Sequence, residues 1–542
     1  MDDEFKELWS RFRGGQITRR DFVRQGLALG MTASALGLLL HNAAPALAAD
    51  TRRAPASPRK GGVLKVADPG PTPGGLDPAV QTDTATIGIC HNIYNFLVRV
   101  DTHLIPYPDL ATTWSTSRDG LTWTFPLRKG VRFHSGKPLT ADDVIYSLNR
   151  IKTLGLGGAT NLKPIARMTK ADDYTVVFHL SSPYPDLAAG LADYHMCIVE
   201  NNFDPQMKAG NSKFTTHPSG TGPFMLSDFV PGDHATLVRN PHYFEAPYPY
   251  LDSVKYVYLP QPTTQVAAVQ SGQVDFVQVL SPAQAAPLKG VSGLTLATLP
   301  TTGFSNMRMR SDRLPFGDPR VRNAFKYIID RKQMDQVLVS GLSPLGADQP
   351  ISPAFTQWFS NLAPRPRDVA KAQALLSAAG YTQAKPLNVN LYASNYNGIL
   401  EFATAFQQMA GDVNNVQVKI TTETLTTYYA ADWLRVDFAI TSWGARPTAQ
   451  EYLNLIYKIG AIWNEGHYNN KALDALISQV GTELDTQKRK SLYKQIATMI
   501  SDDGPSIIPS YNVFVLPLRN RVQGFQPSPD TFHYFKTASL SS

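Results

Sequence analysis

The sequence predicts an α/β fold built from more than one lobe. The chain has 542 residues, which is more than a single hydrophobic core usually serves, so we expect two or three lobes. Apolar residues make up 43% of the chain and charged residues 18%, as is typical of a globular protein. Segments with helical periodicity alternate with short apolar segments along the whole chain, which is the pattern of α/β architecture.

The first 48 residues are predicted to be an export signal. Arg19 and Arg20 precede a stretch rich in Gly, Ala, Leu and Met, and Ala46 and Ala48 offer small side chains for cleavage. The arginine pair is similar to a twin-arginine signal. A membrane anchor is disfavoured, because the apolar stretch is shorter than the roughly 20 residues that a span needs. Residues 49–60 are polar and rich in Pro and Ala, which predicts a flexible leader.

Charge and cysteine content narrow the class of protein further. The formal net charge is +7, and the Lys and Arg residues are spread along the chain rather than clustered. A nucleic-acid-binding surface is therefore not expected. The two cysteines, Cys90 and Cys197, would be able to pair after export, but two cysteines make no disulfide framework, which favours two buried thiols.

The first half of the exported chain shows clear local signals. A strand is predicted over 61–67, and the apolar spacing over 86–100 predicts a helix with one buried face. Alternating apolar residues over 118–133 between two glycine turns predict a hairpin. Thr140, followed three residues later by Asp143, predicts a capping box at the start of a helix.

The second half repeats the alternation. A helix is predicted to end at Gly272 before a short strand, and another to begin at Asp318-Pro319. A helix over 367–380 precedes a strand over 386–393. The apolar segment 436–440 predicts a buried strand that ends at Ile440, and the segment TSWGARP follows it over 441–447. An aromatic residue, a glycine and an arginine after a strand are typical of a small-ligand site.

Motifs that carry catalysis are missing from the sequence. The segment 130–138, GVRFHSGKP, has the wrong spacing for a phosphate-binding loop and a proline where Ser or Thr would hold magnesium. No G-x-S-x-G or H-E-x-x-H is present, and histidines such as His134 and His195 stand singly. We therefore expect no enzymatic activity, no cofactor and no metal site.

Several motifs resemble one known family. Residues 109–151 are similar to the signature of the extracellular solute-binding proteins of the peptide/nickel/opine class of ABC importers. Four further blocks agree with that family in the same order along the chain: GTGPFML at 220–226, RNPHYF at 239–244, SGQVDF at 271–276 and PFGDPRVRNAFKYIIDR at 315–331. The resemblance runs from about residue 61 to the C-terminus.

The resemblance implies a type II periplasmic-binding-protein-like fold, with two lobes joined by a hinge and an extra α/β domain on the first lobe. The first lobe would comprise 61–85, 221–302 and 513–542, the extra domain 86–220 and the inserted second lobe 303–512. The hinge is expected near 301–309, with the last crossing near IIPSYNVF.

The same resemblance implies a monomeric periplasmic protein that captures a peptide-like or opine-like solute by hinge closure and delivers it to the permease subunits of the importer, and it leaves open that this solute is anionic. A binding protein for a metal chelate of the nickel type, or for another anionic solute, is the alternative. A sensor that docks on a membrane partner is a further use of the same fold.

Peptide binders of this family pair the main chain of their ligand with two segments. The resemblance carries these segments onto Thr82, Asp83 and Thr84, and onto Ser442, Trp443 and Gly444. It also suggests further residues that line the cleft between the lobes, namely Tyr94, Asn306, Asn395, Tyr396 and Tyr428.

Arg446 departs from the family pattern. Peptide binders continue Trp-x-Ala-Asp, and that aspartate neutralises the peptide amino group, whereas this chain has Arg446 there. Arg446 either binds a carboxylate or phosphate of the solute or pairs with a nearby acid such as Glu451. Asp83 likewise either binds a solute amine from the other lobe or caps a turn.

Overall fold

In a computed structural model of the protein, the described residues are 58–70, 75–81, 83–155, 158–211, 213–394, 398–529 and 533–541. The chain divides into two compact units, Met1–Ser57 and Pro58–Ser542, and the first lies outside the described residues. The predicted export signal and most of the predicted leader therefore also lie outside them.

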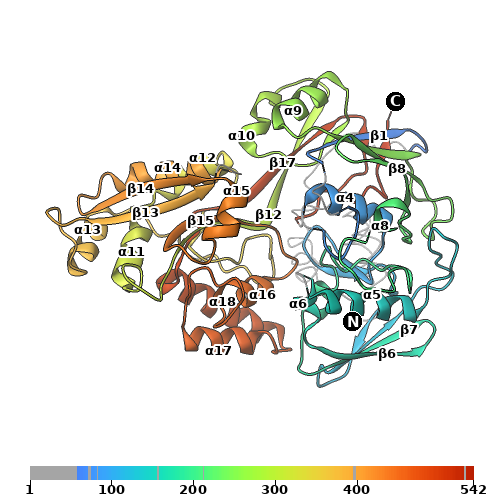
Figure 1. Cartoon of the computed structure of the whole chain (residues 1–542), viewed down its shortest axis with the longest axis horizontal. Helices are drawn as coiled ribbons and strands as arrows, with labels where there is room; N and C mark the ends of the chain where they lie inside the picture. The colour runs from blue at the N-terminus through green and yellow to red at the C-terminus, as the bar shows by residue number, and fades with distance from the viewer. Residues whose placement is uncertain are drawn as a thin grey trace, which may run out of the picture. The chain divides into compact units, whose positions relative to one another are not determined.

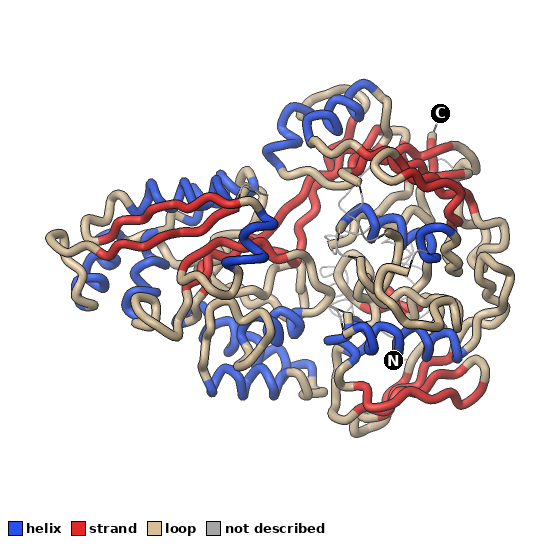
Figure 2. Tube along the Cα trace, in the orientation of Figure 1, coloured by secondary structure: helices blue, strands red, loops and turns tan. Residues whose placement is uncertain are grey.

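Within the described residues, eleven strands form one mixed sheet (Figures 1 and 2). Its order is β14 (Val416–Glu423), β13 (Leu387–Ser394), β15 (Phe438–Trp443), β12 (Leu294–Met309), β17 (Tyr511–Arg519), β11 (Phe276–Val277), β1 (Val63–Asp68), β10 (Ser253–Tyr258), β9 (His234–Arg239) and β8 (Phe224–Val230). The short strand β16 (Ser506–Ile507) pairs with β12. We call the part from β11 to β8 the first lobe and the part from β14 to β15 the second lobe.

Two long strands, β12 and β17, join the lobes and lie side by side. Residues 294–300 of β12 pair with β17, whereas residues 304–309 pair with β15, and the register with β17 shifts between Pro300 and Phe304. A side chain at Gly303 would place its Cβ 2.6 Å from the carbonyl oxygen of Trp443, so only glycine permits this close approach. The irregular segment lies inside the stretch 301–309 where the hinge was expected.

A second sheet belongs to the extra domain on the first lobe. Its order is β4 (Ser115–Thr116), β5 (Thr122–Pro126), β7 (Thr175–Leu180) and β6 (Ile165–Asp172). Of the hairpin predicted over 118–133, only β5 lies inside the segment, with Trp123 and Phe125 buried; its partner β4 precedes the segment, and no second strand follows the turn at Gly130. Helix α5 (Ala141–Leu154) begins with the predicted capping box of Thr140 and Asp143. Small two-stranded ribbons are formed by β2 (Val98–Val100) with β3 (Pro106–Pro108) and by β18 (Val522–Gln523) with β19 (Ser539–Leu540).

The remaining helices pack around these sheets (Figure 1). On the first lobe and extra domain they are α4 (Thr84–Ile93), α6 (Ala159–Leu162), α7 (Leu187–Gly190), α8 (Lys213–Thr216), α9 (Pro262–Ser271) and α10 (Pro282–Ala285). The helices that follow β12 are α11 (Pro319–Ile328), α12 (Arg331–Val339), α13 (Val369–Ala378), α14 (Ile399–Ala410), α15 (Leu425–Thr427), α16 (Ala449–Tyr452), α17 (Lys471–Val480) and α18 (Thr486–Asp503). None of the helices within the described residues is both long and apolar enough to cross a lipid bilayer.

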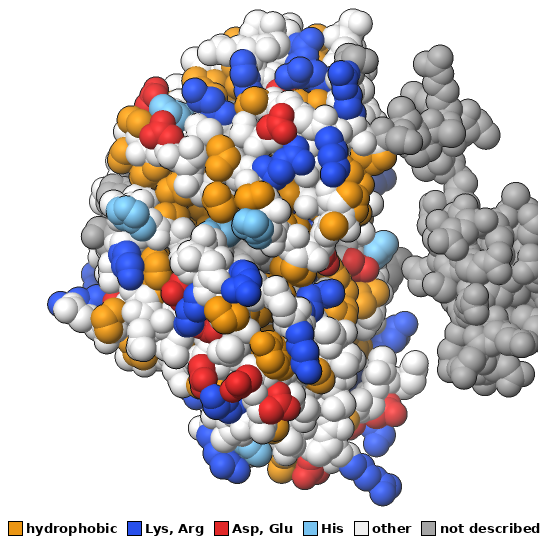
Figure 3. Space-filling model, turned by 90° about the vertical axis from the view of Figure 1, so that its right-hand side faces the viewer, with side chains coloured by type: hydrophobic (Ala, Val, Ile, Leu, Met, Phe, Trp, Pro, Cys, Tyr) orange, Lys and Arg blue, Asp and Glu red, His pale blue; other side chains and the backbone are white. Residues whose placement is uncertain are grey.

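Separate hydrophobic clusters form the cores of the lobes. One cluster joins the first-lobe sheet to the extra domain, and a second lies among β13, β15, α11 and α14. Cys90 and Cys197 are separate buried thiols in the first of these clusters. On the face drawn in Figure 3, Lys and Arg side chains are interspersed with acidic and apolar ones rather than gathered into one basic patch.

Two further predicted elements differ from the structure. The helix expected over 86–100 ends at Ile93, because Tyr94 is extended and Asp109 accepts a hydrogen bond from the backbone N–H of Phe96 at 2.9 Å. The strand expected to end at Ile440 continues through Trp443, because Ser442 and Trp443 pair with Ser305 and Phe304 of β12.

Candidate functional site

The segment 442–446 is held at the end of β15 beside the irregular part of β12. After Trp443 the chain turns at Gly444, whose carbonyl oxygen accepts a hydrogen bond from the Tyr452 hydroxyl at 2.7 Å. The Thr302 hydroxyl accepts from the backbone N–H of Arg446 at 2.8 Å and donates to its carbonyl oxygen at 2.9 Å. Thr302 lies in the irregular part of β12, so the loop is attached directly to that part of the strand.

A cavity of about 190 Å³ opens beside this loop. It is lined by Tyr429, Trp433, Ser442, Trp443, Gly444, Arg446, Trp463 and Glu465. Four predicted site residues, Ser442, Trp443, Gly444 and Arg446, are therefore brought together. Sequence analysis missed the other four, although three of the chain's seven tryptophans fall within residues 433–463.

Glu465 lies at the buried side of this cavity and is 1% exposed. Its carboxylate accepts hydrogen bonds from the indole N–H of Trp433 at 2.6 Å, the hydroxyl of Thr441 at 2.8 Å and the indole N–H of Trp443 at 3.5 Å. Burial raises the pKa of Glu465, while nearby Arg308 and these three donors act in the opposite direction. The side chain thus holds two of the cavity's indoles in place.

Arg446 is turned toward protein groups of both lobes. Its Nε lies 3.5 Å from Oε1 of Glu451 in the second lobe. Tyr194 and Asp193 of the extra domain also interact with it: burial lowers the pKa of Arg446, but Tyr194, Glu451 and Asp193 together raise it above its ordinary value. Of the two alternatives for Arg446, pairing with Glu451 is the one that this conformation contains.

The pKa of the Glu451 carboxyl is shifted in an unusual direction for an acid in an ion pair. Burial raises its pKa to about 7, Arg446 opposes this shift, Asp193 adds to it, and a hydrogen bond with Asn161 lowers it again. An acid in an ion pair ordinarily has a lowered pKa, so here desolvation outweighs the attraction of Arg446. Desolvation therefore works against the charged form of Glu451, and Arg446 works in favour of it.

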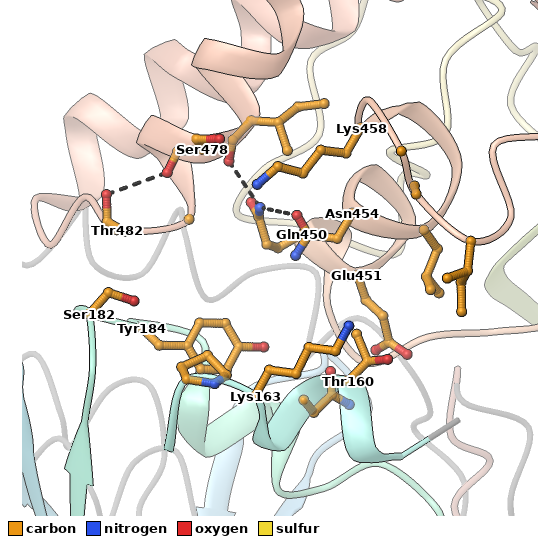
Figure 4. A pocket seen from close by; sticks show the side chains of 18 of the residues that line it. Thr160, Lys163, Ser182, Tyr184, Gln450, Glu451, Asn454, Lys458, Ser478 and Thr482 are labelled. Atoms are coloured by element: carbon orange, nitrogen blue, oxygen red, sulfur yellow. Dashed lines mark hydrogen bonds between the residues drawn. The ribbon is translucent and has the colours of Figure 1, made fainter. Parts of the chain in front are cut away.

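A larger cavity of about 440 Å³ lies between the extra domain and the second lobe (Figure 4). Asn161, Lys163 and Tyr184 come from the extra domain, and Gln450, Glu451, Asn454 and Lys458 come from the second lobe. Gln450 donates hydrogen bonds to the Asn454 side chain at 3.1 Å and to the Ile477 carbonyl oxygen at 3.0 Å. This larger cavity is lined by both polar and apolar side chains, and none of the predicted site residues is among them.

The other predicted residues take different positions. Tyr94 is 0% exposed and packs in the core of the first lobe, so in this conformation it lies inside the lobe rather than on its surface. Asn306 and Tyr428 are buried and line neither cavity, and the Tyr428 hydroxyl accepts a hydrogen bond from Arg308 at 3.2 Å. Thr82, Asn395 and Tyr396 lie outside the described residues.

Asp83 and Thr84 stand at the start of α4. The Asp83 carboxylate caps this helix, accepting hydrogen bonds from the backbone N–H of Thr86 at 2.8 Å and from its hydroxyl at 3.0 Å. This geometry corresponds to the capping alternative for Asp83. Thr84 is the first residue of the helix and is partly exposed.

Metal ligands are not grouped anywhere in the described part of the chain. No set of three or more His, Cys, Asp or Glu side chains there lies close enough to hold a metal ion.

Comparison with known proteins gives one family. The model of the bacterial extracellular solute-binding proteins, family 5 (middle part), matches residues 106–463, which is more than half of the chain. The dipeptide-binding protein of Escherichia coli K12 is 26% identical over 504 residues, covering 86% of this chain and 93% of that protein. Heme-binding protein A of Haemophilus influenzae is also 26% identical, over 505 residues, covering 86% and 90%.

Solved structures show the same fold. The periplasmic binding protein DppA of Helicobacter pylori, in complex with the peptide STSA, superposes with a TM-score of 0.76 at 24% identity, covering 89% of this chain and 99% of that one. The arrangement of two lobes with an extra domain is thus shared along nearly the whole described chain.

Proposed function

Because the chain belongs to the bacterial extracellular solute-binding proteins of family 5, we propose that it captures a peptide-like or opine-like solute between its lobes and delivers it to the permease of an ABC importer. One observation supports this above others. The loop 442–446 lines the smaller cavity, and its Arg446 also reaches Tyr194 and Asp193 of the extra domain. Solute binding and contact between the lobes therefore involve the same loop.

The proposal assigns binding rather than catalysis to this site. The two cavities described above carry tryptophans, amides and ion pairs, and no nucleophile with an adjacent base lines either of them. A dipeptide-binding relative supports a solute with a peptide backbone.

Native mass spectrometry of the protein purified from its own periplasm tests the proposal. We expect a co-purified small molecule, and after its removal we expect saturable binding of one solute per chain by calorimetry. Trp433, Trp443 and Trp463 line the cavity, so binding should also change the tryptophan fluorescence. Absence of a co-purified molecule, together with no saturable binding across di- to nonapeptides and opines, would contradict it.

A metal chelate is the second candidate solute, supported by the heme-binding relative. The described residues offer no group of metal ligands, so a chelate would have to bring its own. Metal analysis of the same periplasmic preparation decides between the two, because a peptide-loaded protein carries no stoichiometric metal.

We also propose that the chain reaches the periplasm by the twin-arginine route. Replacing both arginines of the signal, Arg19→Lys and Arg20→Lys, should leave the protein in the cytoplasm, because the export machinery recognises the arginine pair. Cell fractionation followed by immunoblotting measures this. Unchanged export of the double variant would assign the signal to another route.

A further inference from the structure

The larger cavity, of about 440 Å³, has no part in the proposed function. Its volume falls within the range of about 300–1,000 Å³ that is usual for sites enclosing a small molecule. The extra domain and the second lobe each supply part of its wall (Figure 4). A molecule in this cavity would therefore contact both sides of the interface between the lobes.

Gln450 brings an unpartnered acceptor to the wall of this cavity. Its side chain is 3% exposed, and its Nε2 donates to the Asn454 side chain and to the carbonyl oxygen of Ile477. Because a carbonyl oxygen only accepts, the second contact fixes the orientation of the amide and identifies Oε1 as its oxygen. Among the described residues no donor reaches this Oε1, so a bound molecule would satisfy it by donating a hydrogen bond.

Asn161 and Glu451 line the same cavity from opposite lobes and are 4% and 5% exposed. Asn161 lies close enough to Glu451 to lower the pKa of its carboxyl. The Nδ2 of Asn161 and the Oε2 of Glu451 nevertheless keep unused bonding capacity. The wall thus offers buried acceptors and one donor, a combination that hydroxyl groups can satisfy because each of them both donates and accepts.

The charged groups on the wall favour an anion. Lys163 extends from the extra domain toward the second lobe, and Lys458 extends from the second lobe toward Gln450 (Figure 4). Glu451 is the single acidic residue on the described wall, and its Oε1 lies 3.5 Å from Nε of Arg446. Asp474 accepts a hydrogen bond from the backbone N–H of the residue that follows Lys458, not from its ammonium group.

Both lysines therefore lack an acidic partner within the described residues. Two ammonium groups that face one cavity from opposite lobes repel each other, and an anion between them would replace this repulsion by attraction. A ligand that carried an ammonium group of its own would be repelled by both lysines. Hydroxyl groups are then the donors that suit Gln450 and Glu451.

We propose that this cavity binds a small carboxylic acid that carries several hydroxyl groups, with Lys163 and Lys458 attracting its carboxylate and with Gln450, Glu451 and Asn161 binding its hydroxyls. The site is separate from the smaller cavity, so the inference goes beyond the proposed function and does not rest on it. Because the ligand contacts both lobes, it also favours the conformation in which they touch.

D-Gluconate, D-sorbitol and hexanoate test the two features of the ligand separately. Sorbitol keeps the hydroxylated chain without the carboxylate, and hexanoate keeps the carboxylate without the hydroxyls. We expect gluconate to bind saturably and about tenfold or more tightly than either of the others, as measured by calorimetry at low ionic strength. No binding of gluconate, or equal affinity for gluconate and one of the other two probes, overturns the inference.

Lysine variants test whether both lobes hold the anion. Lys163→Met and Lys458→Met each keep an apolar side chain and remove the charge, so each should weaken gluconate binding about fivefold or more. Lys419→Met is the matched control, because Lys419 is an exposed lysine of β14 in the second lobe that lines neither cavity. Unchanged affinity in either of the first two variants, or an equal loss in the control, refutes the arrangement.

A variant of the smaller cavity shows which of the two sites gluconate occupies. Tyr429 is 39% exposed and lines only the smaller cavity, so Tyr429→Leu should leave gluconate binding unchanged. Thermal unfolding followed by circular dichroism verifies that each variant is folded. A loss in Tyr429→Leu as large as that in Lys163→Met would assign gluconate to the smaller cavity and contradict the inference.

Discussion

Arg446 shows how much the meaning of one residue depends on its neighbours. The sequence places a guanidinium where peptide binders of the family carry an acid, which suggests a solute with the opposite charge. In the structure the same guanidinium faces Glu451, Tyr194 and Asp193, so its charge is balanced by the protein. A buried arginine that lost these partners would be strongly destabilising, and this explains why it need not contact the solute.

A double-mutant cycle distinguishes the two roles of Arg446. The single variants Arg446→Gln and Glu451→Gln should each lower the free energy of unfolding, whereas the double variant should lose less than their sum, with a coupling of about 1–3 kcal/mol. Urea unfolding measures these values. If instead the coupling is near zero and Arg446→Gln weakens only the binding of anionic solutes, Arg446 contacts the anionic group of the solute.

Sequence reasoning succeeded where local rules decide and failed where distant contacts decide. The capping box at Thr140, the end of α9 at Gly272 and the start of α11 after Asp318 follow from residues within one turn of the helix end, and the structure confirms them. The end of α4 at Ile93 depends on Asp109, which binds the backbone N–H of Phe96. Nothing in the spacing of 86–100 encodes that partner.

The candidate site residues can also be divided into those that a local motif indicates and those that only the tertiary fold brings to the cavity. Ser442, Trp443, Gly444 and Arg446 are contiguous, so one motif found all four. Trp433, Trp463 and Glu465 reach the cavity from separate segments, and only the tertiary fold brings them together. Tyr94 was expected to line the cleft only because of its position in the family pattern, and in this structure it is a core residue.

Among the elements, the last turn of α18 accepts hydrogen bonds from a buried lysine. Lys326 of α11 is 0% exposed, and its ammonium group donates to the carbonyl oxygens of Ser501 at 2.9 Å and Ile500 at 3.3 Å. Positive charge at a helix C-terminus is favourable, but the ammonium group has lost its water. Burial lowers the pKa of Lys326 to about 7.

This lysine makes stability depend on pH in a defined direction. Between pH 7 and about 10.5 the folded state binds fewer protons at Lys326 than the unfolded state does, so the free energy of unfolding should rise with pH. The slope should approach about 1 kcal/mol per pH unit. Urea unfolding at pH 7, 8 and 9 measures it, with Lys326→Met as the control that removes the titrating group. Identical slopes in the two proteins would exclude Lys326 as the source.

Across the whole described unit, the extra domain contacts the second lobe through charged pairs. Asp186, next to α7, lies 2.6 Å from the guanidinium of Arg489 on α18, and both side chains are nearly buried. The Arg489 guanidinium also lies 4.6 Å from the ring centroid of Trp358. Together with Arg446 and Tyr194, this pair favours the conformation in which the lobes touch.

Removing the pair should shift the protein toward an open conformation. Asp186→Asn weakens the contact between lobes without altering either cavity, so solute affinity should fall by roughly three- to tenfold as the closed population declines. Small-angle X-ray scattering of the unliganded variant should show a larger radius of gyration. Asp312→Asn, which breaks an ion pair with Arg310 inside the second lobe, serves as the control and should change neither quantity.

The attachment of the loop to Thr302 has a consequence for protein engineering. The Thr302 hydroxyl binds both the N–H and the carbonyl oxygen of Arg446, so the position of the cavity wall depends on the irregular part of β12. Transplanting only the residues that line the cavity into a relative would move the side chains without the support that orients them. A graft that transfers solute preference between relatives needs residues 301–303 together with 442–446.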